Sequence, residues 1–198
     1  MNLIEKAIVL HYHRRRLDLA PLQALGWRDV ESQQRRFDVL CQVGDLNGCT
    51  VLDLGCGYGD FKPFLDQRYT DFTYLGVDQM AEFLTAAQAR YGSLPKTQFV
   101  QADFLNAGLP ASDYVFCSGA LSYRSKSPDY PYALIGQMWR ACRRGLAFNL
   151  LDANQFAHDY VLCGQDPDAV HAYCRQLSPS AELVSGYLPD DFTILMRR

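Results

Sequence analysis

An apolar run that leads directly into a glycine-rich turn constrains this chain more than any other feature. Residues 49–60 read Cys-Thr-Val-Leu-Asp-Leu-Gly-Cys-Gly-Tyr-Gly-Asp, and the aliphatic part is typical of a parallel strand buried on both faces. The glycines, Gly55, Gly57 and Gly59, allow backbone angles and a close approach that a Cβ would obstruct. Because ligands of open α/β sheets bind at the carboxyl ends of the strands, this turn is the predicted ligand site.

The spacing of the glycines distinguishes between nucleotide ligands. Dinucleotide-binding turns follow G-x-G-x-x-G, whereas this turn is G-x-G-x-G followed by Asp60, whose carboxylate would repel a diphosphate. The stretch instead resembles motif I of the class I S-adenosylmethionine (SAM)-dependent methyltransferases, E/D-x-G-x-G-x-G, which is met at every defined position by Asp53, Gly55, Gly57 and Gly59. The resemblance implies SAM as cofactor and S-adenosylhomocysteine (SAH) as its product.

A second motif of the same family follows at the end of the next predicted strand, residues 72–78. Asp78 matches the acidic residue that binds the two ribose hydroxyls in the family, and a carboxylate suits two hydroxyl donors. The next two residues are Gln79 and Met80, and the resemblance places Met80 in preference to Gln79 against the adenine face. A polarizable thioether suits that surface.

The third and fourth motifs lie further along the chain. Residues 97–104 look like the segment in which Asp103 accepts a hydrogen bond from the adenine amino group and the Phe104 amide reaches a ring nitrogen. The other contacts that the resemblance implies are Cys56 in the turn, and Ser118 and Gly119 at the exit of the strand 113–119.

Each of these features alone has an ordinary structural explanation. A G-x-G-x-G stretch can be a simple tight turn, Asp78 could cap the helix that follows it, and Asp103 could be a turn aspartate. Their joint order and spacing argue against that explanation for the whole set, because a motif gains weight from its predicted context.

The alternation of strand and helix patterns predicts an α/β fold, a three-layer sandwich around a seven-stranded, mostly parallel sheet. Helices are predicted at 32–43, where Ser32 could act as N-cap, and at 60–68, 80–91, 129–143 and 167–177, with a fifth strand at 145–151. The runs 181–188 and 191–198 are joined by only two residues, Pro189 and Asp190, so they are expected to pair as an antiparallel C-terminal hairpin. The resemblance implies the same closing hairpin.

Composition favours one globular domain over residues 1–198. The chain is 48% hydrophobic and 21% charged, and no linker, repeat or low-complexity tract interrupts it. The resemblance covers 49–198, a Rossmann-like core, and leaves 1–48 as an N-terminal helical segment expected near the cofactor mouth. The net charge of −3 gives no general case for nucleic acid or an anionic membrane.

Localisation is predicted to be cytoplasmic. We find no secretory leader and no apolar run long enough to span a bilayer. The seven cysteines contain no C-x-x-C pair, which is typical of reduced thiols, and no metal site is predicted. Cys56 and Cys117 are interpreted as small fillers rather than nucleophiles.

The N-terminal segment offers candidates for acceptor binding. Tyr12, Trp27 and Gln33 are hypothesised to line the cofactor mouth. The arginines of this segment, Arg14, Arg15 and Arg16 and further along Arg35 and Arg36, are interpreted first as a solvated helix face, and second as cations for an anionic acceptor. The inner side of this first helix is predicted to consist of its apolar residues, Leu3, Ile4, Ala7, Ile8 and Leu10.

The residues at the exit of the fourth strand exclude some classes of methyl acceptor. Methyltransferases that act on base amino groups or glutamine amides carry an N/D-P-P-Y/F loop there, and this chain has Cys-Ser-Gly-Ala at 117–120 instead. It also lacks the Pro-Cys pair whose thiolate is used in cytosine C5 methylation. No DNA substrate is therefore expected. Tyr123 and Asn149 are candidate acceptor contacts, and a general base, if one is needed, is sought among Tyr123, Tyr130, Asn149, Asp152 and His158 without preference.

The sequence therefore predicts a SAM-dependent methyltransferase that acts on a small molecule. Two alternatives stay open. A protein or RNA methyltransferase of the same fold predicts a contiguous basic surface around the mouth, whereas a small-molecule enzyme predicts an enclosed pocket. A non-catalytic SAM-binding module predicts that side chains fill the space beyond the methyl group. An NAD-linked oxidoreductase is a distant third, and the acceptor atom and the oligomeric state are not predicted.

Overall fold

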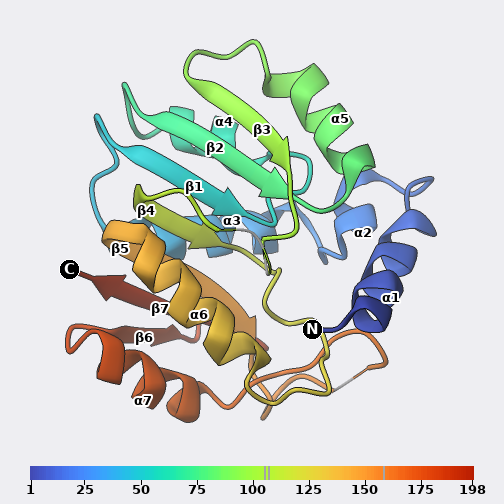
Figure 1. The fold of residues 1–198 in the computed structure, drawn as a ribbon, viewed down its shortest axis with the longest axis vertical. Coiled ribbons are helices and arrows are strands. Elements are labelled where there is room, and N and C mark those ends of the chain that lie inside the picture. Colours follow the sequence, from blue (N-terminus) through green and yellow to red (C-terminus); the bar gives the residue numbers. More distant parts are fainter. Residues whose placement is uncertain (105, 107, 158) are drawn as a thin grey trace.

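The computed structural model describes residues 1–104, 106, 108–157 and 159–198. A seven-stranded sheet runs through these residues in the order β3-β2-β1-β4-β5-β7-β6 (Figure 1). Neighbouring strands among the first five are parallel, and β7 runs antiparallel to both β5 and β6. The strands are β1 (Thr50–Leu54), β2 (Thr73–Asp78), β3 (Thr97–Gln101), β4 (Ser112–Cys117), β5 (Cys142–Leu151), β6 (Glu182–Ser185) and β7 (Asp191–Arg197). The predicted mixed sheet with its C-terminal hairpin is confirmed.

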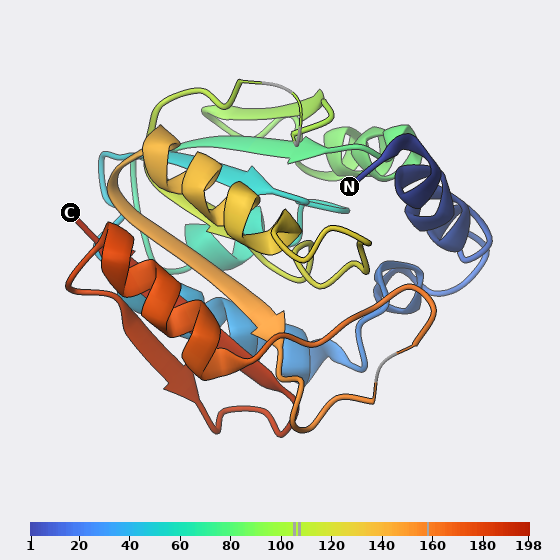
Figure 2. The same ribbon diagram turned by 60° about the horizontal axis from the view of Figure 1, so that its bottom comes forward.

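Helices cover both faces of the sheet. They are α1 (Leu3–Arg14), α2 (Pro21–Leu25), α3 (Val30–Leu40), α4 (Phe61–Asp66), α5 (Ala81–Tyr91), α6 (Tyr130–Ala141) and α7 (Pro167–Leu177), with a 3₁₀ turn at Cys41–Val43. In Figure 2, α6 and α7 lie on one face, and α3 and α4 lie on the other. No helix of the described residues has both the length and the apolar character that crossing a bilayer requires.

Alternate residues of the central strands build the two cores, as a strand period of two requires. In β1, Leu52 and Leu54 join the cluster under α6 and α7, whereas Val51 joins the cluster under α3 and α4. In β4, Val115 and Phe116 divide in the same way. Asp53 takes a position on the second face that an apolar residue would otherwise fill. The sheet thus brings a carboxylate into its own interior, beside the glycine turn.

Several element boundaries differ from the predicted ones. The helix predicted at 32–43 begins at Val30, because Asp29 and not Ser32 is the N-cap: the Asp29 carboxylate accepts the Ser32 amide hydrogen at 2.7 Å. Both residue types cap helices well, so sequence alone does not choose between them. The fifth strand begins three residues before the predicted position, at Cys142, because the chain turns extended directly at the end of α6.

The prediction for the inner side of α1 holds for Leu10, which packs against the cluster of Ala24, Tyr58, Met80 and Phe83, and is wrong for Leu3, Ile4, Ala7 and Ile8. Leu3 and Ile4 are 83% and 73% exposed and Ile8 is 43% exposed, whereas Glu5, Lys6 and His13 are the buried residues of the helix. In Figure 1, α1 and α2 lie beyond the arrowheads of β1 and β2 and not over the apolar face of the sheet. The side of α1 that docks therefore carries the polar contacts of Glu5, Lys6 and His13 beside the apolar contact of Leu10.

Glu5 provides the firmest of these polar contacts. Its carboxylate accepts the Lys126 amide hydrogen at 2.7 Å and the Ser125 hydroxyl hydrogen at 3.0 Å, which ties α1 to the loop after β4. We expect Glu5→Ala to destabilise the docked helix by about 1–3 kcal/mol, because a part-buried amide loses its acceptor. Leu3→Ala, the matched control on the exposed side, is expected to change stability by less than about 0.5 kcal/mol.

Limited trypsin digestion at the arginines that end α1 measures this difference. Cleavage should be faster in Glu5→Ala than in the wild type, and it should be unchanged in Leu3→Ala. Faster cleavage in Leu3→Ala than in Glu5→Ala would show that the apolar side is the docked one after all.

Candidate active site

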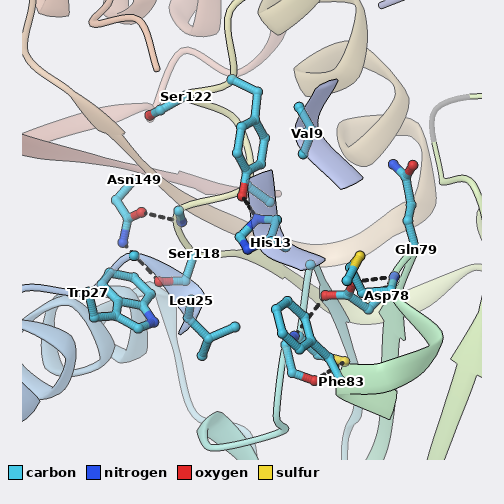
Figure 3. A pocket seen from close by; sticks show the side chains of 18 of the residues that line it. Val9, His13, Leu25, Trp27, Asp78, Gln79, Phe83, Ser118, Ser122 and Asn149 are labelled. Carbon is cyan, nitrogen blue, oxygen red and sulfur yellow. Dashed lines mark hydrogen bonds between the residues drawn. The ribbon is translucent and has the colours of Figure 1, made fainter. Parts of the chain in front are cut away.

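A cavity lies at the carboxyl ends of β1, β2, β4 and β5, where the N-terminal segment covers the sheet (Figure 3). Most residues that the sequence assigned to a cofactor line it, namely Asp53, Gly55, Cys56, Gly57, Asp78, Gln79, Met80, Phe104, Ser118 and Gly119. The predicted acceptor contacts also line it, namely Tyr12, Trp27, Gln33, Tyr123 and Asn149. Residues from opposite ends of the chain are thus brought to one cavity.

Asp78 ends β2 and is 9% exposed. One carboxylate oxygen accepts the Gly57 amide hydrogen and the other accepts the Met80 amide hydrogen, both at 2.8 Å (Figure 3). Burial raises the pKa of Asp78, and the two amide hydrogen bonds oppose that rise. Each oxygen keeps a further lone pair, so the fixed carboxylate can accept two hydroxyl hydrogens from a diol in the cavity.

The glycine turn holds its backbone in the left-handed region, with φ of +74° at Gly55, +55° at Gly57 and +78° at Gly59. A Cβ at Gly57 would lie 2.7 Å from Leu25 of α2, so the N-terminal segment packs directly on the turn. Gly59 does not line the cavity. A Cβ there would lie 2.8 Å from the ring of Phe99, so the packing of β3 also requires a glycine at this position.

Asp53 lies beneath the turn and is 2% exposed. The Tyr74 hydroxyl donates a hydrogen bond to it at 2.5 Å. Burial raises the pKa of Asp53 to about 7, the bond from Tyr74 opposes the rise, and the neighbouring Asp78 adds to it. The carboxyl group can therefore change its charge near neutral pH.

This raised pKa predicts a pH-dependent stability. The folded-state pKa of Asp53 lies above its unfolded value of about 3.9, so the stabilisation that it contributes is present below that value and is lost as the pH rises through about 7. Between pH 5 and pH 8, the wild type should lose about 3 kcal/mol of unfolding free energy relative to Asp53→Asn, which cannot ionise there. Urea unfolding at both pH values measures this, with the exposed Asp18→Asn as control. Parallel pH profiles for wild type and Asp53→Asn would contradict the assignment.

Asp103 is adjacent to the cavity and is not among the residues that line it. Its carboxylate forms an ion pair with Lys6, whose side chain is buried and does line the cavity. The β3 strand ends at Gln101, and Asp103 therefore stands in the loop that follows, facing α1. The same loop presents Phe104 to the cavity. Together, α1 and this loop close the end of the cavity that the sequence assigned to the adenine.

Asn149 of β5 orders the exit of β4. Its carbonyl oxygen accepts the Gly119 amide hydrogen at 2.8 Å and its amide group donates to the Ser118 hydroxyl at 3.2 Å (Figure 3). The indole ring of Trp27 packs on Gly119, because a Cβ added to Gly119 would lie 3.2 Å from that ring. The end of the cavity at the exits of β4 and β5 is therefore bounded by the Trp27 indole and the Asn149 amide.

His13 is a cavity residue that the sequence analysis did not single out. Its Nδ1 lies 3.0 Å from the Ala24 carbonyl oxygen, which can only accept, so Nδ1 carries the hydrogen. Its Nε2 then accepts the Tyr123 hydroxyl hydrogen at 2.6 Å (Figure 3). Burial lowers the pKa of His13, which favours the neutral ring. A histidine within a polar run at 11–16 gave no signal in sequence, because its partners lie on other elements.

The remaining predicted residues divide between positions away from the cavity and positions in its lining. Arg14 pairs with Glu82 and Arg16 donates to the Tyr12 hydroxyl. None of the arginines at 14–16 is among the residues that line the cavity, whereas Arg36 of the same predicted cluster does line it, and a role toward an acceptor stays a prediction. Asp152 accepts the Asn154 amide hydrogen at 2.8 Å in a local turn. Tyr130 does line the cavity, and His158 lies outside the described residues.

Thiol or metal chemistry finds no support among the described residues. Burial raises the pKa of the Cys56 and Cys117 thiols, which disfavours a nucleophilic thiolate. Across the part of the chain that the structure describes, no group of three or more His, Cys, Asp or Glu side chains is placed to hold a metal ion. The cavity instead offers a fixed carboxylate, backbone amides, aromatic rings and a neutral histidine.

Comparison with known proteins identifies the family of this chain. A family model described as a methyltransferase domain matches residues 51–145. A protein of Mycobacterium tuberculosis named as a methyltransferase, Rv1506c, is 33% identical over 159 residues, which are 75% of this chain and 93% of that protein. Trans-aconitate 2-methyltransferase of Azoarcus sp. strain BH72 is 33% identical over 125 residues, 62% of this chain, and the match spans 46% of that longer protein.

Solved structures share the fold. Magnesium protoporphyrin IX methyltransferase from Synechocystis PCC 6803 with bound SAH superposes with a TM-score of 0.72 at 18% identity, over 98% of this chain and 99% of that one. The fold, with its cavity at the carboxyl ends of the strands, is that of a Rossmann-like methyltransferase. The chain belongs to the class I SAM-dependent methyltransferases, and it is an enzyme whose cofactor is SAM.

Proposed function

We propose that the enzyme transfers the methyl group of SAM to a small molecule held between the N-terminal segment and the exits of β4 and β5. The observation that carries this proposal is the composition of the cavity at that end. Tyr12, Trp27, Gln33, Tyr123 and Asn149 line it, and the arginines of α1 face elsewhere. Aromatic and amide groups around a cavity suit a small acceptor, whereas a macromolecular partner calls for an open basic surface.

In this proposal the cofactor lies across the strand ends. Its ribose hydroxyls donate to Asp78, and Met80, in preference to Gln79, borders the adenine face. The Phe104 amide borders the adenine edge, and Asp103, which pairs with Lys6 next to the cavity, accepts from the adenine amino group. The methionine part then runs over Gly55, Cys56 and Gly57 toward Ser118 and Gly119.

The chemistry needs an acceptor atom in line with the sulfonium methyl group. Much of the acceleration then comes from holding the two reactants in contact and excluding water. The His13–Tyr123 pair is the group best suited to receive a proton, because the Nε2 lone pair of the neutral ring already points at the Tyr123 hydroxyl. It is needed only for an acceptor that arrives protonated. The names of the relatives, which include acceptors such as trans-aconitate and magnesium protoporphyrin IX, support a small molecule without defining which.

Transfer of a labelled methyl group tests the proposal. The purified enzyme is incubated with methyl-labelled SAM and a cell extract separated into small-molecule, protein and RNA fractions, with Asp78→Asn as the control. The proposal expects label in the small-molecule fraction only, and less of it with the variant. Label in protein or RNA would support the macromolecular alternative. An absence of transfer by protein that binds SAH would support the non-catalytic one.

A further inference from the structure

Helix α1 turns most of its apolar residues outward. The residues that it exposes, with those that follow at its C-terminal end, recur every three or four positions and so share one side. They are Leu3, Ile4, Ala7, Ile8, His11, Arg14 and Arg15. The buried residues of the helix are Glu5, Lys6 and His13. Because a surface helix usually turns its apolar side toward the core, this arrangement indicates a contact for the outer side other than water.

The apolar part of the outer side continues onto a neighbouring loop. Leu3 is 83% exposed, Ile4 is 73% exposed and Ile8 is 43% exposed. Ile8 lines a surface groove together with Tyr160, which is 75% exposed. These four residues form the apolar patch. In Figures 1 and 2, α1 stands at the edge of the molecule, so the patch is open to a surface that approaches from outside.

Cations lie beside the apolar patch. Arg124 and Lys126 line the same groove as Ile8 and Tyr160, and Arg15 continues the exposed side of α1. These three cations form the cationic rim. Among the described residues, no acidic side chain forms an ion pair with any of them. The rim therefore keeps its charge available for an anionic surface.

Two acidic side chains lie near the patch, and both are engaged within the protein. Glu5 lines the groove, but its carboxylate accepts the hydrogens of the Lys126 amide and the Ser125 hydroxyl. Asp159 accepts two backbone amide hydrogens of its own loop. The charge available at this surface is thus positive, although the net charge of the whole chain is −3.

An anionic lipid surface matches both parts of this side. Helices that lie in a membrane interface combine an apolar side with Lys and Arg, and Tyr is favoured at the same depth. Lipid phosphates attract basic residues close to the membrane. A standard protein interface takes about 20–30 residues on each side, many more than the patch and the rim provide. The observations therefore favour lipid over a protein partner.

We propose that the outer side of α1, with Tyr160, adsorbs the enzyme to an anionic lipid surface. The apolar patch enters the boundary between headgroups and acyl chains, and the cationic rim meets the lipid phosphates. Val9 lines both the groove and the active-site cavity, so α1 separates the two. Adsorption then holds the cavity about 10–12 Å, one helix diameter, from the lipid surface. The inference does not depend on which acceptor the enzyme methylates.

Co-sedimentation with lipid vesicles tests the inference. The purified protein is mixed with vesicles of phosphatidylcholine alone, or with vesicles in which part of the lipid is phosphatidylglycerol. The wild type should bind the anionic vesicles at least about 10-fold more tightly, because each basic residue near the surface adds to the attraction. High salt should weaken this binding by screening the charges.

The double variant Ile4→Ser/Ile8→Ser tests the apolar patch. It should bind anionic vesicles at least about 10-fold more weakly, because two aliphatic side chains no longer leave water on binding. Val100→Ser is the matched control, since Val100 is 45% exposed but lies on β3. It should bind as the wild type does. Circular dichroism and SAH binding verify that each variant is folded.

The double variant Arg15→Gln/Lys126→Gln tests the cationic rim. It should bind anionic vesicles about 10- to 30-fold more weakly, at about fivefold for each charge. Arg143→Gln/Arg175→Gln removes the same charge from exposed positions on β5 and α7, and it should change the affinity by less than about threefold.

Three results would overturn the inference. The first is that folded wild-type protein does not bind anionic vesicles, or binds both kinds of vesicle equally. The second is that the patch or rim variants lose no more affinity than their controls. The third is a wild-type dimer, seen by analytical ultracentrifugation without lipid, that dissociates in Ile4→Ser/Ile8→Ser, because the patch would then be an interface between two copies of the chain.

Discussion

Asp78→Ala is expected to lower the affinity for SAH by at least about 100-fold, because two charge-assisted hydrogen bonds to the ribose, each worth about 1.5–3 kcal/mol, are lost together. The effect is large because the carboxylate is already oriented by the Gly57 and Met80 amides and sits at 9% exposure. Isothermal titration measures it.

Two controls separate binding from folding in this experiment. Asp71→Asn removes a carboxylate of the same kind at a site far more exposed, and it should leave SAH affinity unchanged. A thermal melt of Asp78→Ala shows whether the protein is folded, since the Gly57 and Met80 amides lose their acceptor in it. Wild-type SAH affinity in folded Asp78→Ala would remove Asp78 from the cofactor site.

Gly55→Ala is expected to destabilise the protein by about 2–5 kcal/mol, from a left-handed φ that costs an L-residue about 1–2 kcal/mol and from a steric clash of about 1–3 kcal/mol. The residue has a φ of +74°, and a Cβ there would lie 2.5 Å from the Cβ of Ala120. For a chain of this length, the loss corresponds to a fall in Tm of roughly 5–15 °C. Cofactor affinity should fall with it, because Ala120 follows Gly119 at the cavity wall.

Gly48→Ala is the matched control. Gly48 also has a positive φ, +69°, but no atom lies within 4 Å of the position that a Cβ would take. It should therefore show only the backbone cost, with a fall in Tm of roughly 2–8 °C and no change in SAH affinity. Equal losses in the two variants would mean that the contact with Ala120 contributes nothing.

The sequence was sufficient for the fold and for the glycine-turn side of the site. Motif I, Asp78 and the two-residue connection before β7 are local features, and local backbone chemistry decides them. Two of the predicted cofactor residues, Gly59 and Asp103, are not among the residues that line the cavity, and their roles stay predictions. Phe99 packs against Gly59 and Lys6 pairs with Asp103, and both neighbours lie outside the local motif that each residue belongs to.

The N-terminal side of the site could not be predicted in the same way. Helical periodicity reports which residues share a face, but not what that face meets. Here the face meets loop amides and polar groups, so Glu5 and His13 are buried and Leu3 and Ile4 are exposed. Glu5 and His13 each have one partner more than 100 residues away along the chain, Lys126 and Tyr123 respectively, and no local pattern encodes such pairs.

The most direct measurement is a crystal structure of the enzyme with SAH bound. The account predicts both ribose hydroxyls within hydrogen-bond distance of the Asp78 carboxylate and the amino-acid part lying past the glycine turn toward Gly119 and Trp27. A ribose held by other residues, or a nucleoside bound outside this cavity, would contradict the account.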